Sequence, residues 1–136
     1  MSWDKYCGKW QSTTLEKFDE YMKALDVNMV LRKAGAMSTT YIEITQDGDD
    51  WRWQYKIAFK SGDLRFQLGQ DFEETTPDGR KCISKVTYEG DKLIWLQRGK
   101  PCDSIITRYF EDNYNTMVEE CVAKDVTCTR KYKRLE

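Results

Sequence analysis

The stretch that decides the fold is residues 51–68, which read WRWQYKIAFKSGDLRFQL. From residue 51 to 57, large apolar side chains occupy every second position and polar ones fill the gaps. Residues 64–68 repeat this alternation with Leu, Phe and Leu. A period of two indicates a β-strand with one buried face. The tripeptide SGD at 61–63 predicts the turn that joins the two strands.

Turn-forming residues also recur at regular intervals on both sides of this stretch. Further turn signals are DGD at 47–49, PDG at 77–79, EGD at 89–91, RGKP at 98–101 and EDN at 111–113. From Thr39 onward the spacing is about ten residues per unit, which is typical of an antiparallel meander of about nine strands. Both prolines fall at turn signals, so neither interrupts a predicted strand.

The N-terminal third differs from this pattern. After a short strand around Cys7–Thr13, the stretch Leu15–Leu25 carries apolar residues at helical spacing, with Thr13 and Thr14 as N-cap candidates. Residues 26–28 break this helix, and Asn28 is a candidate N-cap for a second helix over Met29–Ala36.

Strands in this number favour closure into a barrel, because a closed sheet has no exposed edges. A barrel of this size is too wide for its own side chains to fill, so it should enclose a cavity. Two stacked sheets with a dry core are the alternative. No linker or composition shift divides residues 1–136, so we expect a single domain.

Composition excludes several classes of function. The net charge is −1, which does not suit a protein that coats nucleic acid. The chain has no histidine, so Ser-His and Cys-His nucleophile pairs and His metal ligands are absent. Five cysteines without a CxxC pair suggest free thiols in a reducing compartment. We therefore expect a cytoplasmic monomer with no cofactor and no metal site, and not an enzyme.

Two arginines stand out on the predicted inner faces. In the last strand, Arg130 and Tyr132 share the parity of Val126 and Cys128, and Arg108 shares that of a neighbouring isoleucine. A buried arginine keeps its charge and needs an anion or several acceptors. We find no inward-facing acid that is an obvious partner for both. Two arginines and a phenol would suit one ligand carboxylate; the alternative is that they end in solvent or in internal ion pairs.

The chain resembles the intracellular lipid-binding proteins, which include fatty-acid-binding and cellular retinoid-binding proteins. The motifs that carry the resemblance are GKW at 8–10, FDEYMKAL at 18–25, VN at 27–28, LRK at 31–33, FK at 59–60, FQLG at 66–69, FEET at 72–75, D78 with RK at 80–81, GDKL at 90–93 and CTRKY at 128–132. Lys17 departs from the family pattern, which has Asn or His there, and the turn at 111–116 is longer than usual.

The resemblance implies an all-β fold: a ten-stranded antiparallel up-and-down β-barrel with a helix-turn-helix lid between the first two strands. It also implies that Arg108, Arg130 and Tyr132 bind a ligand carboxylate. Together with the alternation, it places the following residues in the pocket or at its portal: Phe18, Tyr21, Met22, Val27, Leu31, Trp53, Tyr55, Phe59, Trp95 and Ile106.

The resemblance further implies the ligand class. Retinol binders of the family carry Gln at the positions of Arg108 and Arg130 and Phe at that of Tyr132, so these residues argue for an acid over an alcohol. We expect a non-covalent carrier of a long-chain fatty acid, with retinoic acid or another retinoid as the alternative.

Basic residues on the lid form a further expectation. Lys23, Arg32 and Lys33 should lie close together once the two helices pack, beside the portal. We expect them either to be a solvated helix face or to make transient contact with anionic membranes. Relatives that enter the nucleus use similarly placed residues as an import signal, a role left open here.

Overall fold

The computed structural model describes residues 2–135, which form a short 3₁₀ helix, two α-helices and ten strands. The elements are the 3₁₀ helix Ser2–Tyr6, β1 Gly8–Glu16, α1 Phe18–Ala24, α2 Met29–Ala36, β2 Tyr41–Asp47, β3 Asp50–Ile57, β4 Lys60–Phe66, β5 Phe72–Thr75, β6 Lys81–Glu89, β7 Lys92–Arg98, β8 Ser104–Glu111, β9 Thr116–Ala123 and β10 Val126–Arg134. Within this part of the chain, no helix is both long and apolar enough to cross a membrane.

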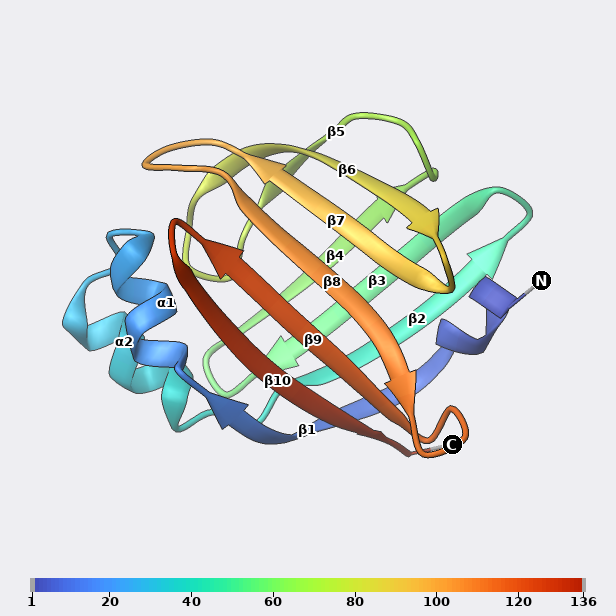
Figure 1. Ribbon diagram of the computed structural model, residues 1–136, viewed down its shortest axis with the longest axis horizontal. Coiled ribbons are helices and arrows are strands. Elements are labelled where there is room, and N and C mark those ends of the chain that lie inside the picture. The colour runs from blue at the N-terminus through green and yellow to red at the C-terminus, as the bar shows by residue number, and fades with distance from the viewer. Residues whose placement is uncertain (1, 136) are drawn as a thin grey trace.

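The ten strands form one antiparallel sheet that rolls into a nearly closed barrel (Figure 1). Strands that are neighbours in sequence pair with each other, except β4 and β5, and β1 also pairs with β10, so that the sheet order runs from β4 through β1 and β10 to β5. The edges of the sheet are therefore β4 and β5. This architecture confirms the predicted up-and-down barrel and contradicts the alternative of two stacked sheets.

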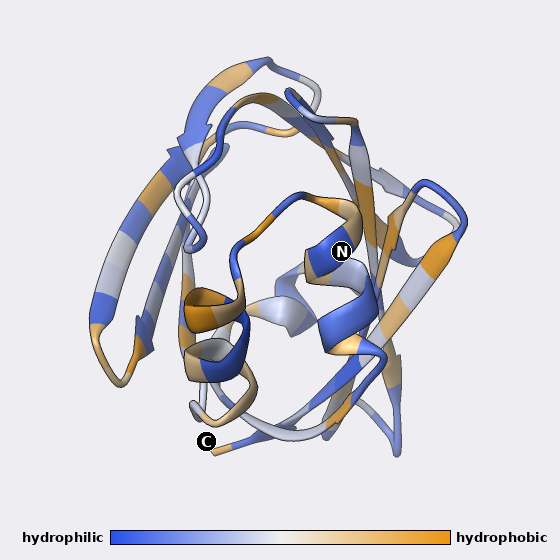
Figure 2. Cartoon of the chain, turned by 90° about the vertical axis from the view of Figure 1, so that its left-hand side faces the viewer, coloured by the Kyte–Doolittle hydropathy of each residue, from blue (hydrophilic) through white to orange (hydrophobic). Residues whose placement is uncertain are grey.

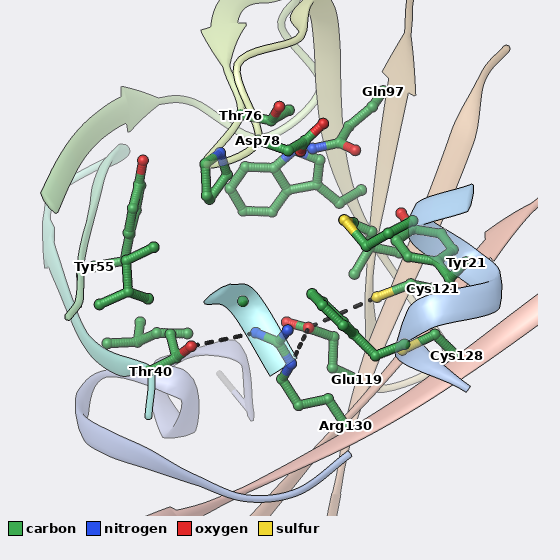
Figure 3. Close-up of a pocket in the computed structure, with 18 of the residues that line it drawn as sticks. Tyr21, Thr40, Tyr55, Thr76, Asp78, Gln97, Glu119, Cys121, Cys128 and Arg130 are labelled. Atoms are coloured by element: carbon green, nitrogen blue, oxygen red, sulfur yellow. Dashed lines mark hydrogen bonds and ion pairs between the residues drawn. The ribbon is translucent and has the colours of Figure 1, made fainter. Parts of the chain in front are cut away.

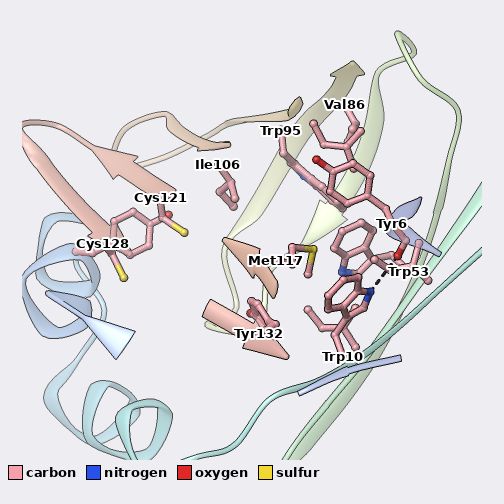
Figure 4. Packing of buried hydrophobic residues seen from close by; sticks show 14 of the residues in the cluster. Tyr6, Trp10, Trp53, Val86, Trp95, Ile106, Met117, Cys121, Cys128 and Tyr132 are labelled. Atoms are coloured by element: carbon pink, nitrogen blue, oxygen red, sulfur yellow. Dashed lines mark hydrogen bonds between the residues drawn. The ribbon is translucent and has the colours of Figure 1, made fainter. Parts of the chain in front are cut away.

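Alternation along the strands places the bulky side chains inside the barrel. Trp53 and Trp95 are 3% and 2% exposed and meet edge to face, with ring centroids 5.2 Å apart. Tyr6 and Trp10 lie at the end of the barrel opposite the two helices (Figures 1 and 4). The ring of Phe110 packs against both and completes a plug at this end. The indole N–H of Trp10 donates to the carbonyl of Tyr6 over 3.0 Å, so the polar groups of this plug have partners.

The two helices cover the other end of the barrel (Figure 2). As predicted, α2 begins after Asn28, whose side chain accepts a hydrogen bond of 3.0 Å from the backbone N–H of Leu31. Arg32 joins the helices, because its Nε lies 2.8 Å from a carboxylate oxygen of Asp19 and its Nη1 donates to the Val27 carbonyl. The tyrosine hydroxyl of Tyr21 on α1 shares a hydrogen bond with a serine of β8, which fixes the lid to the barrel.

The start of the first helix is a correction to the sequence prediction. Residues 15 and 16, which were predicted as helix, are strand, because β1 continues to pair with β10 beyond a bulge between Ser12 and Thr14. The helix begins only at Phe18. Its N-cap residue is Lys17, which adopts left-handed backbone geometry with φ 59° and makes no side-chain cap. The predicted caps Thr13 and Thr14 are therefore wrong.

The turn predicted at residues 61–63 is also wrong. Those residues belong to β4, and the chain reverses instead at Ala58 and Phe59. Gly62 lies directly opposite Tyr55 of β3, and a Cβ built on Gly62 would stand 2.1 Å from the tyrosine ring. Glycine is here because an aromatic ring covers its backbone, and not because the chain turns.

Candidate functional site

A cavity lies between the lid and the plugged end of the barrel (Figure 3). All thirteen residues that the sequence assigned to the pocket, portal or carboxylate site line it: Phe18, Tyr21, Met22, Val27, Leu31, Trp53, Tyr55, Phe59, Trp95, Ile106, Arg108, Arg130 and Tyr132. Their roles in ligand binding remain predictions.

Arg108 is fixed from two sides. Its Nε donates to a carboxylate oxygen of Glu119 over 2.9 Å, and its Nη2 lies 2.7 Å from the same oxygen in an ion pair. Its guanidinium lies over the rings of Trp53 and Trp95, 4.6 and 4.9 Å from their centroids. Its Nη1 is buried and has no hydrogen-bond partner among the described residues.

Arg130 is held more loosely than Arg108. Its Nη1 donates to the Tyr132 hydroxyl over 3.1 Å. The same atom donates to the Thr40 hydroxyl over 3.4 Å (Figure 3). Its Nε lies 3.9 Å from the nearer oxygen of Glu119, which is an ion-pair distance without a hydrogen bond. Its side chain is 19% exposed, against 7% for that of Arg108. Arg130 therefore has more donor capacity to offer a ligand.

Glu119 on β9 joins the two arginines and overturns an expectation. It is 5% exposed, contacts both guanidiniums, and accepts a hydrogen bond of 3.4 Å from the Tyr132 hydroxyl. Burial alone would raise the pKa of the Glu119 carboxyl, but the charges of Arg108 and Arg130 outweigh it and hold that pKa below its usual range. The expectation that no inward acid partners both arginines is wrong; the alternative of an internal ion pair holds.

A second polar group lies in the same cavity and was also missed. The buried carboxylate of Glu74 accepts hydrogen bonds from the Ser84 hydroxyl, the Trp95 indole N–H and the Gln97 amide over 2.8, 3.0 and 3.2 Å. The side-chain carbonyl oxygen of Gln97 is buried and has no hydrogen-bond partner among the described residues. The alternation of residues 93–97 placed Gln97 inward, but no sequence signal paired it with Glu74.

The charged residues that line the cavity balance in number. The cations are Arg80, Arg108 and Arg130, and the anions are Glu74, Asp78 and Glu119. Arg80 and Asp78 form their own ion pair at 2.7 Å. The cavity lining is thus formally neutral before any ligand enters.

Apolar side chains line the lid end of the cavity, where an entrance is predicted. Phe59, at the turn between β3 and β4, lines the cavity although its side chain is 52% exposed. Val27 and Leu31 line the cavity from the lid side, and Met29 and Val30 are exposed at the start of α2. An exposed aromatic side chain between solvent and cavity, such as that of Phe59, is suited to control the passage of a ligand.

The expected basic patch is smaller than the sequence suggested. Lys23 and Lys33 are exposed on α1 and α2. The side chain of Arg32 is only 12% exposed and is engaged by Asp19 and Val27. Arg32 therefore acts as a tie between the helices rather than as a free surface charge.

The five cysteines are free thiols. Cys121 and Cys128 face each other across β9 and β10 and line the cavity. Within residues 2–135, no three His, Cys, Asp or Glu side chains gather in a way that could hold a metal ion.

Comparison with known proteins agrees with this geometry. Residues 7–135 match the model of the lipocalin / cytosolic fatty-acid binding protein family. The chain is 43% identical over 129 residues to sodium/calcium exchanger regulatory protein 1 of Doryteuthis pealeii, covering 95% of this chain and 96% of that protein. It is 42% identical to a solved structure described as the REP1-NXSQ fatty acid transporter, with a TM-score of 0.90 and 96% of each chain covered.

A third relative contains a ligand. The fatty acid binding protein of Schistosoma mansoni, solved in complex with arachidonic acid, is 31% identical, with a TM-score of 0.94 over 100% of both chains. The family match spans nearly the whole barrel, and identity well above 30% extends over almost the full length of the relatives. The chain belongs to the lipocalin / cytosolic fatty-acid binding protein family.

Proposed function

We propose that this protein is a non-covalent carrier of a hydrophobic carboxylate ligand, with a long-chain fatty acid as the first candidate. The observation that carries the proposal is the placement of Arg108, Arg130 and Tyr132 in an otherwise largely apolar cavity. The carboxylate of the ligand would lie on the donors of Arg130 and Tyr132, which makes these residues the source of orientation and selectivity.

The apolar lining provides the affinity in this proposal. An acyl chain gains about 0.8 kcal/mol per methylene on leaving water, so sixteen carbons offer on the order of 10 kcal/mol before the costs of association. Relatives described as a fatty acid transporter and as a fatty acid binding protein with arachidonic acid support the same ligand class.

Retinoic acid, or another retinoid, is the alternative ligand. It presents the same carboxylate to Arg130 and Tyr132, and its conjugated chain would pack against the cavity aromatics Phe18, Trp53 and Trp95. The carboxylate site does not distinguish the two acids.

The proposal includes the setting in which the carrier works. We place it in the cytoplasm as a monomer, in line with the name of the family and with the five free thiols. No chemical step is assigned to the cavity. Lys23 and Lys33 beside the entrance would make transient contact with anionic membranes, and Arg32 would support them by holding α2 against α1.

Native mass spectrometry of protein from its own source tests the proposal. A carrier should retain one ligand per chain, and the mass of the released ligand separates a fatty acid from retinoic acid. Purified protein without its ligand should regain one fatty acid per chain. Failure to bind either acid, or turnover of an added lipid without a stoichiometric complex, would contradict the carrier function.

A further inference from the structure

The position suited to a ligand carboxylate is already shared by a carboxylate of the protein. Glu119 accepts a hydrogen bond from Nε of Arg108, forms an ion pair with its Nη2 at 2.7 Å, and lies 3.9 Å from Nε of Arg130. With the Tyr132 hydroxyl as a third donor, it uses the same set of groups that would hold a ligand.

Donors nevertheless remain for a second carboxylate. Nη1 of Arg108 is buried without a partner among the described residues, and Arg130 makes no hydrogen bond of standard length to Glu119. A ligand that uses these donors would place its own carboxylate within a few ångströms of Glu119. Two carboxylates that share one site cannot both stay ionised without strong mutual repulsion, so the proton affinity of the pair rises.

The charge balance of the cavity also favours uptake of a proton when an acid binds. The three arginines and three acids of the lining already cancel. An ionised ligand would leave one uncompensated negative charge in a largely apolar enclosure, which is costly unless a proton removes it.

We propose that Glu119 couples ligand binding to a proton: a ligand carboxylate enters the site together with one proton from solvent, which Glu119 and the ligand carboxyl share, whereas a neutral ligand enters without one. The proposal rests on the carrier function proposed above. Its chemistry is a single O–H bond formed to one carboxylate oxygen, with buffer as the proton source. Glu119 is thus a specificity-determining residue that weakens the preference for an acid over a neutral ligand.

The other groups around Glu119 do not supply this proton readily. Arg108 on β8 and Arg130 on β10 stay charged. Burial raises the pKa of the Tyr132 hydroxyl on β10 and of the Tyr21 hydroxyl on α1, so both stay neutral near pH 7.

The remaining neighbours are two thiols. Cys121 on β9 lies 3.6 Å from a Glu119 oxygen, and Cys128 faces it from β10. A hydrogen bond with Cys128, together with burial, holds the pKa of Cys121 well above its usual range, while the same hydrogen bond lowers the pKa of Cys128. Glu119→Gln removes the carboxyl charge and leaves both thiols in place. That variant therefore distinguishes proton uptake by the carboxyl pair from proton uptake by the thiols.

The direction of the pH dependence follows from the free protein. Because the arginines hold the pKa of Glu119 below its usual range, the carboxyl is ionised at neutral pH and the proton must be taken up on binding. Affinity for an acid should therefore fall as pH rises, by up to about tenfold per pH unit for one proton taken up. Affinity for the matching alcohol should stay constant.

Calorimetry in two buffers of different ionisation enthalpy measures the protons directly. We would titrate dodecanoic acid and dodecan-1-ol into the wild type, Glu119→Gln and, as a matched control, Glu120→Gln on the opposite face of the same strand. The wild type and Glu120→Gln should take up about 0.5–1 proton per acid bound and none per alcohol. Glu119→Gln should take up almost none, and at pH 8 should bind the acid about tenfold more tightly and the alcohol within about threefold of the wild type.

Two results would overturn the proposal: stoichiometric binding of the acid by the wild type without proton uptake, or uptake that persists in Glu119→Gln. Binding of the alcohol shows that each variant is folded, and the wild-type proton count decides the matter even if Glu119→Gln does not fold. If neither ligand forms a one-to-one complex, the carrier function itself fails, which is a different result.

Discussion

At the scale of single residues, the cavity depends on how inward side chains fit against one another. Gly62 shows this most clearly. It lies opposite Tyr55, whose ring occupies the space that a Cβ on Gly62 would need, with two ring atoms 2.1 and 2.4 Å from that Cβ and the hydroxyl oxygen at 2.6 Å. The absence of a side chain at residue 62 thus lets the Tyr55 ring lie against the sheet and line the cavity.

Gly62→Ala should therefore destabilise the fold through Tyr55. We expect the free energy of unfolding to fall by about 1–3 kcal/mol, the usual scale for overpacking. In a Tyr55→Ala background, the same substitution should cost under about 0.5 kcal/mol, because the clash is gone. Urea denaturation of the four proteins measures this cycle. Equal losses in the two backgrounds would contradict the role of the ring.

Alternation alone was enough to place Arg108, Arg130 and Tyr132 inside the barrel. It did not reveal Glu119, because β9 offers two apolar faces. Met117 and Cys121 share the parity of Glu119, but two valines share the opposite parity, and a second glutamate follows at residue 120. The usable signal was the pairing of β9 with β10, in which Cys121 faces Cys128; this register fixes Glu119 as inward.

At the scale of elements, the second helix and the turn between β3 and β4 carry the residues of the predicted entrance. The Asn28 cap fixes the start of α2, and the tie from Arg32 to Asp19 holds that helix against α1. Phe59 extends from the turn beside them and is half exposed while lining the cavity. Neither α2 nor the two turn residues take part in strand pairing, so they suit control of ligand passage.

Phe59→Ala should change ligand exchange more than affinity. A gate residue acts on the barrier, so we expect on- and off-rates to rise together by more than about twofold while the dissociation constant changes less. Stopped-flow fluorescence with a fatty acid analogue measures both rates. Ile105→Ala removes an apolar residue of comparable exposure, 44% against 52% for Phe59, on the outer face of β8 and should leave both rates unchanged. Rates for Phe59→Ala within twofold of the wild type would count against the gate.

Sequence reasoning succeeded for one helix and failed at the start of the other. Both bounds of α2 were predicted, because Asn28 is a strong capping residue and an exposed helix follows its local signals. The start of α1 was missed because Leu15 fits a helical face equally well, and only its pairing with Arg130 across the sheet keeps it in β1. That pairing joins residues far apart in the sequence, so the residues around Leu15 give no signal of it.

At the scale of the whole molecule, charge is nearly balanced, with 22 basic and 23 acidic residues. Local placement therefore matters more than the total. Lys23 and Lys33 are exposed on the lid, while the charge of Arg32 is matched by Asp19. Attraction to an anionic surface would orient the entrance toward it, and would weaken beyond about 8 Å at physiological salt.

Anionic vesicles should accept ligand from the wild type faster than neutral vesicles do, with an advantage that shrinks as salt rises. Lys23→Glu with Lys33→Glu should abolish most of this acceleration, and adding Arg32→Glu should mainly lower lid stability. Transfer of a fluorescent fatty acid between protein and vesicles measures the rate. If anionic lipid does not accelerate wild-type transfer, or the double variant keeps the acceleration, the two lysines are only a solvated face.

The barrel was predictable as a whole because strand alternation and regular turns recur over a hundred residues, so that a single wrong turn, such as the one assigned to 61–63, does not alter the topology. The ion pairs of Glu119 with the two arginines depend on the register between β9 and β10. They could not be predicted from a repeated pattern. The fold is thus encoded redundantly, whereas the site depends on a few residues.

The central claim, that Arg130 and Tyr132 hold the carboxylate of a hydrophobic acid, is tested most directly by calorimetry with hexadecanoic acid and hexadecan-1-ol on the wild type, Arg130→Gln and the outward-facing control Arg65→Gln. We predict that Arg130→Gln loses about 2–4 kcal/mol of binding free energy for the acid, the usual scale for removing one buried partner of a charge pair. The alcohol should lose under about 0.5 kcal/mol, because it presents no charge to this site, and Arg65→Gln should change neither. An equal loss for acid and alcohol in Arg130→Gln would contradict the account.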